Sequence, residues 1–222
     1  MQDTIPVLTI DGPSGAGKGT TARAVAARLG WNFLDSGAIY RALAVAAMDR
    51  RVSWEDEAAL EALAESMDLV FEAGPAPRIL LWNNDIGRRI LTEECGNLAS
   101  KMAAFPAVRR ALLDKQRSFR RLPGLVADGR DMGTVVFPDA PYKIFLTASA
   151  EVRALRRYNQ LKEKGIDVSL AHLTEEIEER DRRDRERQTA PLRAAEDAVV
   201  IDSSDLTVDE VIEACLSVVT SH

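Results

Sequence analysis

The stretch TIDGPSGAGKGTTARAV, residues 9–25, decides the fold and raises the first question about function. It contains a glycine, four further residues, then Gly17 and Lys18, which is the skeleton of a phosphate-binding loop. Gly19 stands where a Ser or Thr is usual. Residues 5–11 are typical of a buried parallel strand, and residues 18–29 carry apolar side chains at helical spacing. Strand, loop and helix therefore occur in the order that nucleotide binding requires.

The glycines of this loop allow positive φ angles, so its N–H groups and the start of the next helix can face a phosphate. Lys18 adds a point charge for the terminal phosphates. In the common loop the hydroxyl after the lysine ligates Mg²⁺, but Gly19 has none and Thr20 is displaced by one position. We therefore expect Mg²⁺ to arrive with ATP and to be held mostly by phosphates and water. The expected ATP-binding residues are Gly12, Pro13, Ser14, Gly15, Ala16, Gly17, Lys18, Gly19 and Thr20.

Composition excludes several other classes of protein. The 222 residues are 46% hydrophobic and 29% charged, which is typical of one globular core. The net charge of −6 gives no basic field for DNA or RNA, and the two histidines disfavour imidazole catalysis. Cys95 and Cys215 have the spacing of neither a disulfide framework nor a zinc site. The sequence shows no signal-peptide pattern and no apolar run of membrane-spanning length, so we expect a cytoplasmic protein without membrane contact.

Short apolar segments alternate with helix-like sequence along most of the chain. Gly30 is placed to end the first helix, a second helix is predicted at 38–48, and Thr207 and Glu210 have capping-box spacing before a last helix. Strands alternating with helices predict an α/β fold in three layers around a five-stranded parallel sheet. The predicted core strands lie in 5–11, 31–37, 124–129, 142–147 and 197–202.

Residues 67–92 break this alternation. Their pattern of apolar residues, with turn signals at Gly74, Pro75, Pro77 and 83–85, predicts a small antiparallel β insert. A helical return follows it in the sequence.

A phosphorylated acceptor would need convergent cations. The segments at 35–41, with Arg41, and 128–133, with Arg130, come at or just after predicted strand ends, where ligands bind open α/β sheets. A third segment, ERDRRDRER at 179–187, puts Arg180, Asp184 and Arg187 on one face of a helix. Its pattern alone favours a solvated helix laced with ion pairs.

Four separated motifs together resemble the bacterial cytidylate kinases, which make CDP from CMP and ATP. They are IDGPSGAGKGT, LDSGAIYR, ADGRDMGTVVFPDAPYKIFL and ERDRRDRERQTAPL, and the resemblance runs from about residue 5 to 220. It implies one P-loop kinase unit over 1–222 with Mg²⁺ and ATP, acting on CMP and dCMP as a monomer. The implied regions are a core at about 1–37, 106–152 and 190–222, an acceptor-binding region with the insert at about 38–105, and a mobile lid with the arginine-rich helix at about 153–189.

The resemblance also implies a role for individual residues. The base would be read by Ser100, Arg109 and Asp131, and the ribose would contact Arg180 and Asp184. The remaining implied residues are Arg41, Arg130 and Arg187 at the acceptor phosphate, and Asp35, Ser36, Gly37 and Tyr40 in the pocket wall.

Phosphoryl transfer needs alignment and charge stabilisation rather than covalent chemistry. We therefore expect Lys18, Arg41, Arg130 and Arg187 to be catalytic, no direct protein ligand to the metal, and Asp128 to hold magnesium-bound water. A kinase for another nucleoside monophosphate, and a non-catalytic ATP-binding module, remain as alternatives. A GTPase is disfavoured because neither N-K-x-D nor D-x-x-G occurs, and an RNA-binding protein by the acidic net charge and few aromatic residues.

Overall fold

The computed structural model describes residues 5–72, 78–163, 165 and 167–220. By its internal contacts the chain divides into two compact units, 1–34 with 119–222, and 35–118. The predicted functional regions follow different boundaries from these units, and they stay predictions.

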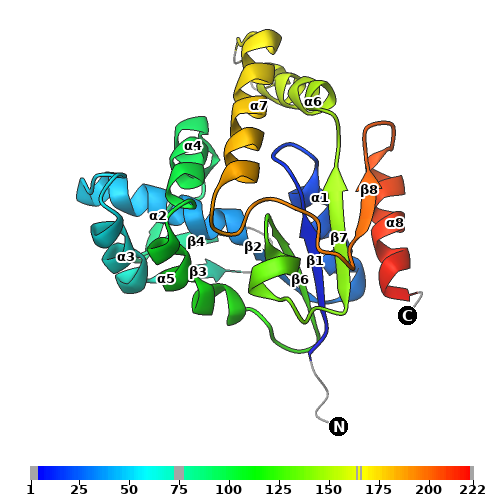
Figure 1. Ribbon diagram of the computed structural model, residues 1–222, viewed down its shortest axis with the longest axis horizontal. Helices are drawn as coiled ribbons and strands as arrows, with labels where there is room; N and C mark the ends of the chain where they lie inside the picture. The colour runs from blue at the N-terminus through cyan, green and yellow to red at the C-terminus, as the bar shows by residue number, and fades with distance from the viewer. Residues whose placement is uncertain (1–4, 73–77, 164, 166, 221–222) are drawn as a thin grey trace. The chain divides into compact units, whose positions relative to one another are not determined.

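The first unit is built on a five-stranded sheet (Figure 1). Its central strands pair in parallel, with Ile10 opposite both Asp128 and Ile144. All residues of the two strands that contain Ile10 and Asp128 are buried, which explains their continuous apolar character. In spatial order the strands are β2 (Asn32–Asp35), β6 (Leu125–Gly129), β1 (Val7–Asp11), β7 (Tyr142–Thr147) and β8 (Val199–Asp202). The predicted five-stranded parallel sheet is therefore confirmed.

Two helices complete the main core of this unit. α1 (Lys18–Leu29) ends at Gly30, which adopts φ 65°, and α8 (Val208–Thr220) begins with the predicted capping box. In that box the Thr207 N–H donates to the Glu210 carboxylate at 2.8 Å and the Glu210 N–H donates to the Thr207 hydroxyl at 3.3 Å. The buried cluster joins the sheet to both helices: Leu8, Ile10, Ala22, Val25, Ala26, Val126, Ile144, Leu146, Ile201, Val211, Ile212 and Cys215.

The same unit carries a helical pair and a short π-helical turn. α6 (Ala150–Glu163) packs against α7 (Leu170–Glu186) through Ala154, Leu161 and Leu173. The turn η2 (Met132–Val136) follows β6 and contacts β1. It therefore places the residues after β6 next to the end of the first strand.

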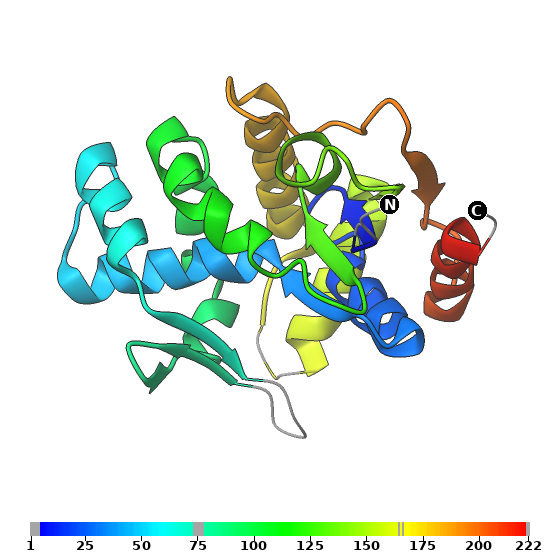
Figure 2. The ribbon, with the colours of Figure 1, turned by 90° about the horizontal axis from the view of Figure 1, so that it is seen from below.

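The second unit combines helices with a three-stranded antiparallel sheet, which Figure 2 shows from below. The sheet confirms the predicted β insert. Its strands are β3 (Leu69–Glu72), β4 (Arg78–Leu81) and β5 (Asn84–Asp85). Its helices are α2 (Ser36–Arg50), α3 (Glu57–Ser66), η1 (Arg89–Leu91), α4 (Glu93–Met102) and α5 (Pro106–Arg117).

Two local expectations in this unit differ from the structure. Ser36 and Gly37 already belong to α2, because Asp35 caps the helix by accepting the Ala38 N–H at 2.9 Å. The turn expected at 83–85 comes one residue earlier, with Trp82 and Asn83 both at positive φ. The expected turn residues Gly74, Pro75 and Pro77 lie outside the described part of the chain.

Gly124 illustrates how tightly β2 is held against β6. The Asn32 N–H and side-chain amide both donate to the Gly124 carbonyl at 2.9 Å. A Cβ at position 124 would lie 2.4 Å from the Trp31 ring. The position therefore has no room for a side chain.

We predict that Gly124→Ala lowers the free energy of unfolding by about 1–3 kcal/mol, because the methyl group overpacks the contact with Trp31. Gly30→Ala is the comparison: a Cβ there would meet open space, and its penalty comes from the φ of +65° alone. Backbone strain alone should cost about 1 kcal/mol there. Urea unfolding of both variants measures the difference in their free energies of unfolding. An undiminished stability of Gly124→Ala would show that the Trp31 ring shifts aside at no cost.

Candidate active site

The phosphate-binding loop connects β1 to α1 and is shaped by its glycines. Gly12 adopts φ 152°, and a Cβ there would lie 1.9 Å from the Leu146 carbonyl oxygen of β7. Gly17 is the N-cap residue of α1 and adopts φ 88°. It has no side chain, so no side-chain hydrogen bond caps the first N–H groups of the helix. The first N–H groups of α1 therefore remain available to an anion, as phosphate binding requires.

Lys18 is buried within this loop. Its Nζ donates to the Pro13 carbonyl at 2.9 Å and lies 3.9 Å from Asp128 Oδ1. Burial and then the nearby Arg130 charge lower the pKa of Lys18 to about 7, although Asp128 opposes this shift. The lysine is therefore close to losing its charge until an anion reaches it.

The residues around Gly19 indicate which groups would bind a magnesium ion. A Cβ at Gly19 would lie 3.3 Å from Asp128 Oδ2, and Thr20 is exposed. In the described residues no cluster of three or more His, Cys, Asp or Glu side chains could hold a metal ion. Asp128 is a buried carboxylate beside the loop, and position 19 offers no hydroxyl group. This arrangement fits a Mg²⁺ ion that is bound mainly by phosphate oxygens of ATP.

Asp11 is a residue of the site that the sequence argument missed. It ends β1, is buried, and accepts the Met132 and Gly133 N–H groups on its two carboxylate oxygens, both at 2.8 Å. Burial raises the pKa of Asp11 to about 7, against the effect of these two hydrogen bonds. Asp11 thereby joins the phosphate loop to the segment after β6. A carboxylate ending an apolar strand just before such a loop was the available signal.

The residues after β6 meet the end of α7. Arg130 Nε donates to Asp184 Oδ2 at 3.0 Å, and Arg187 Nη2 lies 4.0 Å from Asp131 Oδ1. Burial alone would raise the pKa of Asp184, but Arg130, Arg180 and Arg187 hold it below its usual value. Three of the predicted acceptor-site arginines therefore act on one carboxylate.

Helix α7 has one buried and one solvated face. Asp181 and Asp184 are buried, whereas Arg182 forms an exposed ion pair with Glu179. The exposed pair agrees with the predicted solvated face, and the acceptor-binding role of the other face stays a prediction. Arg187 lies just after its end, with its Nε donating to the Ala190 carbonyl at 2.6 Å, so its position does not follow from helical spacing.

In the second unit two of the predicted CMP-contacting residues, Arg109 and Tyr40, lie against each other. The Arg109 guanidinium lies 5.8 Å from the centre of the Tyr40 ring and donates to the Ala103 carbonyl at 3.3 Å. Arg41 Nη1 donates to the Ile90 carbonyl at 2.8 Å. Ser100 on α4 is buried, like Arg109 on α5.

The residues at the start of α2 have structural partners. Asp35 caps the helix, and the Ser36 hydroxyl donates to Gln116 Oε1 at 2.7 Å. A Cβ at Gly37 would lie 3.2 Å from Asp35 Oδ1, so a small residue suits this turn.

The predicted CMP contacts therefore divide between the two units. Arg130, Asp131, Arg180, Asp184 and Arg187 lie in the first, and Asp35, Ser36, Gly37, Tyr40, Arg41, Ser100 and Arg109 in the second. That the two sets act on one substrate stays a prediction.

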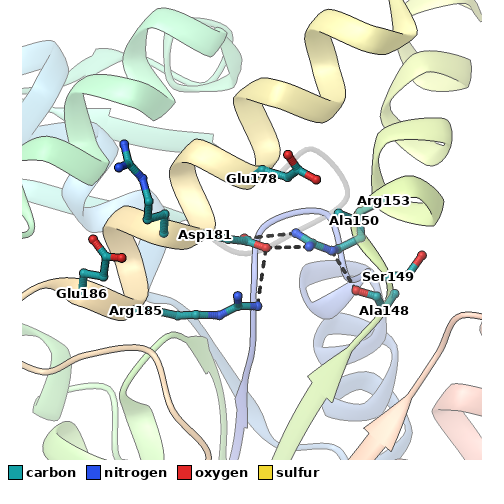
Figure 3. Close-up of a pocket in the computed structure, with 9 residues that line it drawn as sticks. Ala148, Ser149, Ala150, Arg153, Glu178, Asp181, Arg185 and Glu186 are labelled. Atoms are coloured by element: carbon teal, nitrogen blue, oxygen red, sulfur yellow. Dashed lines mark hydrogen bonds and ion pairs between the residues drawn. The ribbon is translucent and has the colours of Figure 1, made fainter.

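A pocket of about 380 Å³ lies at the start of α6 beside α7, within the first unit (Figure 3). Arg153, Asp181 and Arg185 meet in its wall. Asp181 and Arg185 belong to the arginine-rich segment 179–187, but neither they nor Arg153 were predicted to be site residues.

A parallel five-stranded sheet, a glycine-shaped loop with a buried lysine, and arginines gathered after β6 and on α7 define a P-loop kinase.

The comparisons with known proteins identify the family. A family model described as cytidylate kinase matches residues 8–221. A cytidylate kinase from Methylococcus capsulatus is 86% identical over 222 residues, covering 100% of both chains, and one from Aeromonas salmonicida is 58% identical over 98% of this chain and 95% of its own. The chain belongs to the cytidylate kinase family.

Among solved structures, shikimate kinase from Acinetobacter baumannii in complex with shikimate shares the fold. Its TM-score is 0.50 at 15% identity, with 99% of this chain and 95% of that chain covered. In the described part of the chain, no helix has the length and apolar character needed to cross a membrane.

The lowered pKa of Lys18 predicts that ATP binding takes up a proton. Bound phosphates favour the charged amine, so affinity is fully present below pH 7 and falls as pH rises above 7, by up to about tenfold per unit. Calorimetry of a non-hydrolysable ATP analogue with Mg²⁺ at pH 8, in buffers of different ionisation enthalpy, should show uptake of about one proton. Lys18→Met should abolish that uptake; equal uptake in both proteins would assign it elsewhere.

Proposed function

We propose that this protein transfers the terminal phosphate of ATP to CMP, forming CDP, and that dCMP is a second acceptor. The observation that carries the proposal is the group of arginines around Asp184 in a chain whose full length matches cytidylate kinases. Convergent cations beside a phosphate-binding loop are what a phosphorylated acceptor requires.

The phosphate loop, residues 12–20, is the proposed ATP site. Its N–H groups and the start of α1 bind the phosphates, and Lys18 leaves the Pro13 carbonyl to contact them. Asp128 would hold water bound to the Mg²⁺ that comes with ATP, and that ion would supply charge neutralisation at the phosphates. The proposal needs no protein side chain bonded to the metal.

Different residues are proposed to contact the phosphate, the base and the ribose of CMP. Arg41, Arg130 and Arg187 bind the CMP phosphate because guanidinium forks suit its oxygens. Ser100, Arg109 and Asp131 offer donors and acceptors to the cytosine edge, and Arg180 and Asp184 contact the ribose. Asp35, Ser36, Gly37 and Tyr40 border the nucleotide.

Catalysis in this proposal comes from position and charge. Lys18, Arg41, Arg130 and Arg187 stabilise the charge that spreads over the transferring group. The first-unit cations have carboxylate or carbonyl partners in the structure, such as Asp184 at 3.0 Å from Arg130. In the proposal, the phosphate of the bound nucleotide becomes a further anionic partner of Arg130, beside Asp184 and Asp128. The cytoplasmic location and the monomeric state stay predictions.

A panel of acceptors tests the function. ADP release with Mg·ATP is measured for CMP, dCMP, UMP, AMP and GMP separately. We expect fast turnover with CMP and dCMP, weak turnover with UMP, and little with either purine nucleotide, because the cytosine-reading groups are left unpaired by other bases. Turnover on a purine would make this a kinase for another nucleoside monophosphate, and ATP binding without turnover would leave a nucleotide-binding module.

Asp131→Ala tests the reading of the base. Loss of an acceptor for the cytosine amine should reduce kcat/KM for CMP more than for UMP, by a difference of about 1–3 kcal/mol, which is roughly 5- to 150-fold. Arg187→Ala is the control, since it removes the ion partner of Asp131 and a proposed phosphate contact but no base contact. It should lower kcat/KM for both substrates by similar factors. Equal losses in Asp131→Ala would reject its role at the base.

A further inference from the structure

Arg153 on α6 makes contacts to three separate segments of the first unit. Its Nε donates to the Ala148 carbonyl at 2.9 Å, and its Nη1 donates to the Ser14 carbonyl of the phosphate loop at 2.9 Å. Both terminal nitrogens also donate to Asp181 on α7, at 3.1 and 2.5 Å (Figure 3). One guanidinium therefore joins the end of β7, the phosphate loop and α7.

Both members of this ion pair are buried. The side chains of Arg153 and Asp181 are 3% and 5% exposed. Asp181 Oδ2, which accepts from Arg153, also lies 3.8 Å from Arg185 Nη2. Arg185 is an exposed cation one turn further along α7. Bidentate geometry between a planar guanidinium and a carboxylate fixes relative orientation as well as distance.

The loop is packed closely against this arginine. Gly15 adopts φ 78°, and a Cβ there would lie 3.2 Å from the Arg153 Cβ. The loop backbone therefore meets α6 through van der Waals contact as well as through the Ser14 hydrogen bond. A displacement of Arg153 would be transmitted directly to the loop.

Asp181 occupies a particular place on α7. It lies between Arg180 and Asp184, and Asp184 accepts from Arg130 at 3.0 Å. The pair with Arg153 therefore fixes the turn of α7 that carries these two residues. The same pair acts on the loop through Ser14.

Stability alone is a weak explanation for such a pair. A buried ion pair is often replaced by apolar residues of similar volume without loss of stability. An apolar pair, however, has no donor for the Ser14 and Ala148 carbonyls and no fixed orientation. The feature that only the charged pair supplies is the geometric connection.

We propose that Arg153 and Asp181 are positioning residues that hold α7 in register with the phosphate loop. They set the distance between the ATP phosphates and the α7 groups that contact the acceptor. This inference rests on the proposed function of those two segments. It also implies that ATP and CMP increase each other's affinity through the pair, since such coupling is reciprocal.

The double variant Arg153→Met/Asp181→Leu tests the inference, because it leaves no buried charge without a partner. Its thermal unfolding midpoint, kcat, both KM values and the Kd for CMP with and without a non-hydrolysable ATP analogue are measured. We expect a folded protein whose kcat is lowered by roughly 10- to 100-fold through misalignment. KM for ATP should change by less than about threefold, and the analogue should no longer tighten CMP binding.

Glu179→Gln/Arg182→Gln is the matched control, since it removes an exposed ion pair on the same helix. It should retain wild-type kinetics. Asp181→Asn is the second variant: it leaves the buried Arg153 without its anion, but keeps the shape of the side chain at 181 and the arginine hydrogen bonds to the Ser14 and Ala148 carbonyls. It should show the same pattern in smaller measure, so the inference stays testable if the double variant fails to fold.

Wild-type kcat and undiminished ATP–CMP coupling in a folded double variant, or in Asp181→Asn where the double variant does not fold, would overturn the inference. Failure of the proposed function appears elsewhere, as lack of CMP turnover by the wild-type protein in the acceptor panel. The two failures are therefore distinguished by different proteins.

Discussion

The structure around the phosphate loop depends on one constraint, that charges removed from water must be paired. Each buried ion in an apolar interior costs several kcal/mol unless it is compensated. Lys18, Asp11 and Asp184 are all buried, and each has partners in the first unit. The loop folds back onto Lys18, the segment after β6 is tied to Asp11, and α7 is tied to Arg130. Pairing of these charges thus specifies how the surrounding segments meet.

Much of the fold was predictable because its determinants are local or periodic. β1 and β6 are buried along their whole length, so they appear in the sequence as short apolar runs. The capping box at Thr207 and the end of α1 at Gly30 depend only on neighbouring residues. The antiparallel insert was also recognisable, although its turn lies one residue earlier than expected. Trp82 at positive φ, with Arg50 over its ring at 4.4 Å, is a tertiary solution that turn preferences do not predict.

The site was predictable only in part, and the missing residues share a physical cause. Asp11 meets Met132, and Arg153 meets Ser14, over sequence separations of 121 and 139 residues. In the sequence Arg153 is one arginine among several on an amphipathic helix, and nothing local marks it as buried. Arg187 was assigned to a helical face, but the helix ends before it and an extended backbone directs its side chain. Motifs mark candidate substrate contacts more readily than the groups that hold those contacts in place.

The pairing constraint also explains how an acidic protein, with a net charge of −6, can bind polyanionic nucleotides. Arg130, Arg180 and Arg187 act on Asp184, and Asp128 partly offsets the burial of Lys18, so each of these cations has a carboxylate nearby before any substrate is present. Under the proposed function, a phosphate that enters this cluster competes with carboxylates that are already aligned with the cations. The cations then need little reorganisation when charge develops, which is where electrostatic catalysis gains most. The buried carboxylates are in this view part of the catalytic apparatus, because they keep the arginines in place while the site is empty.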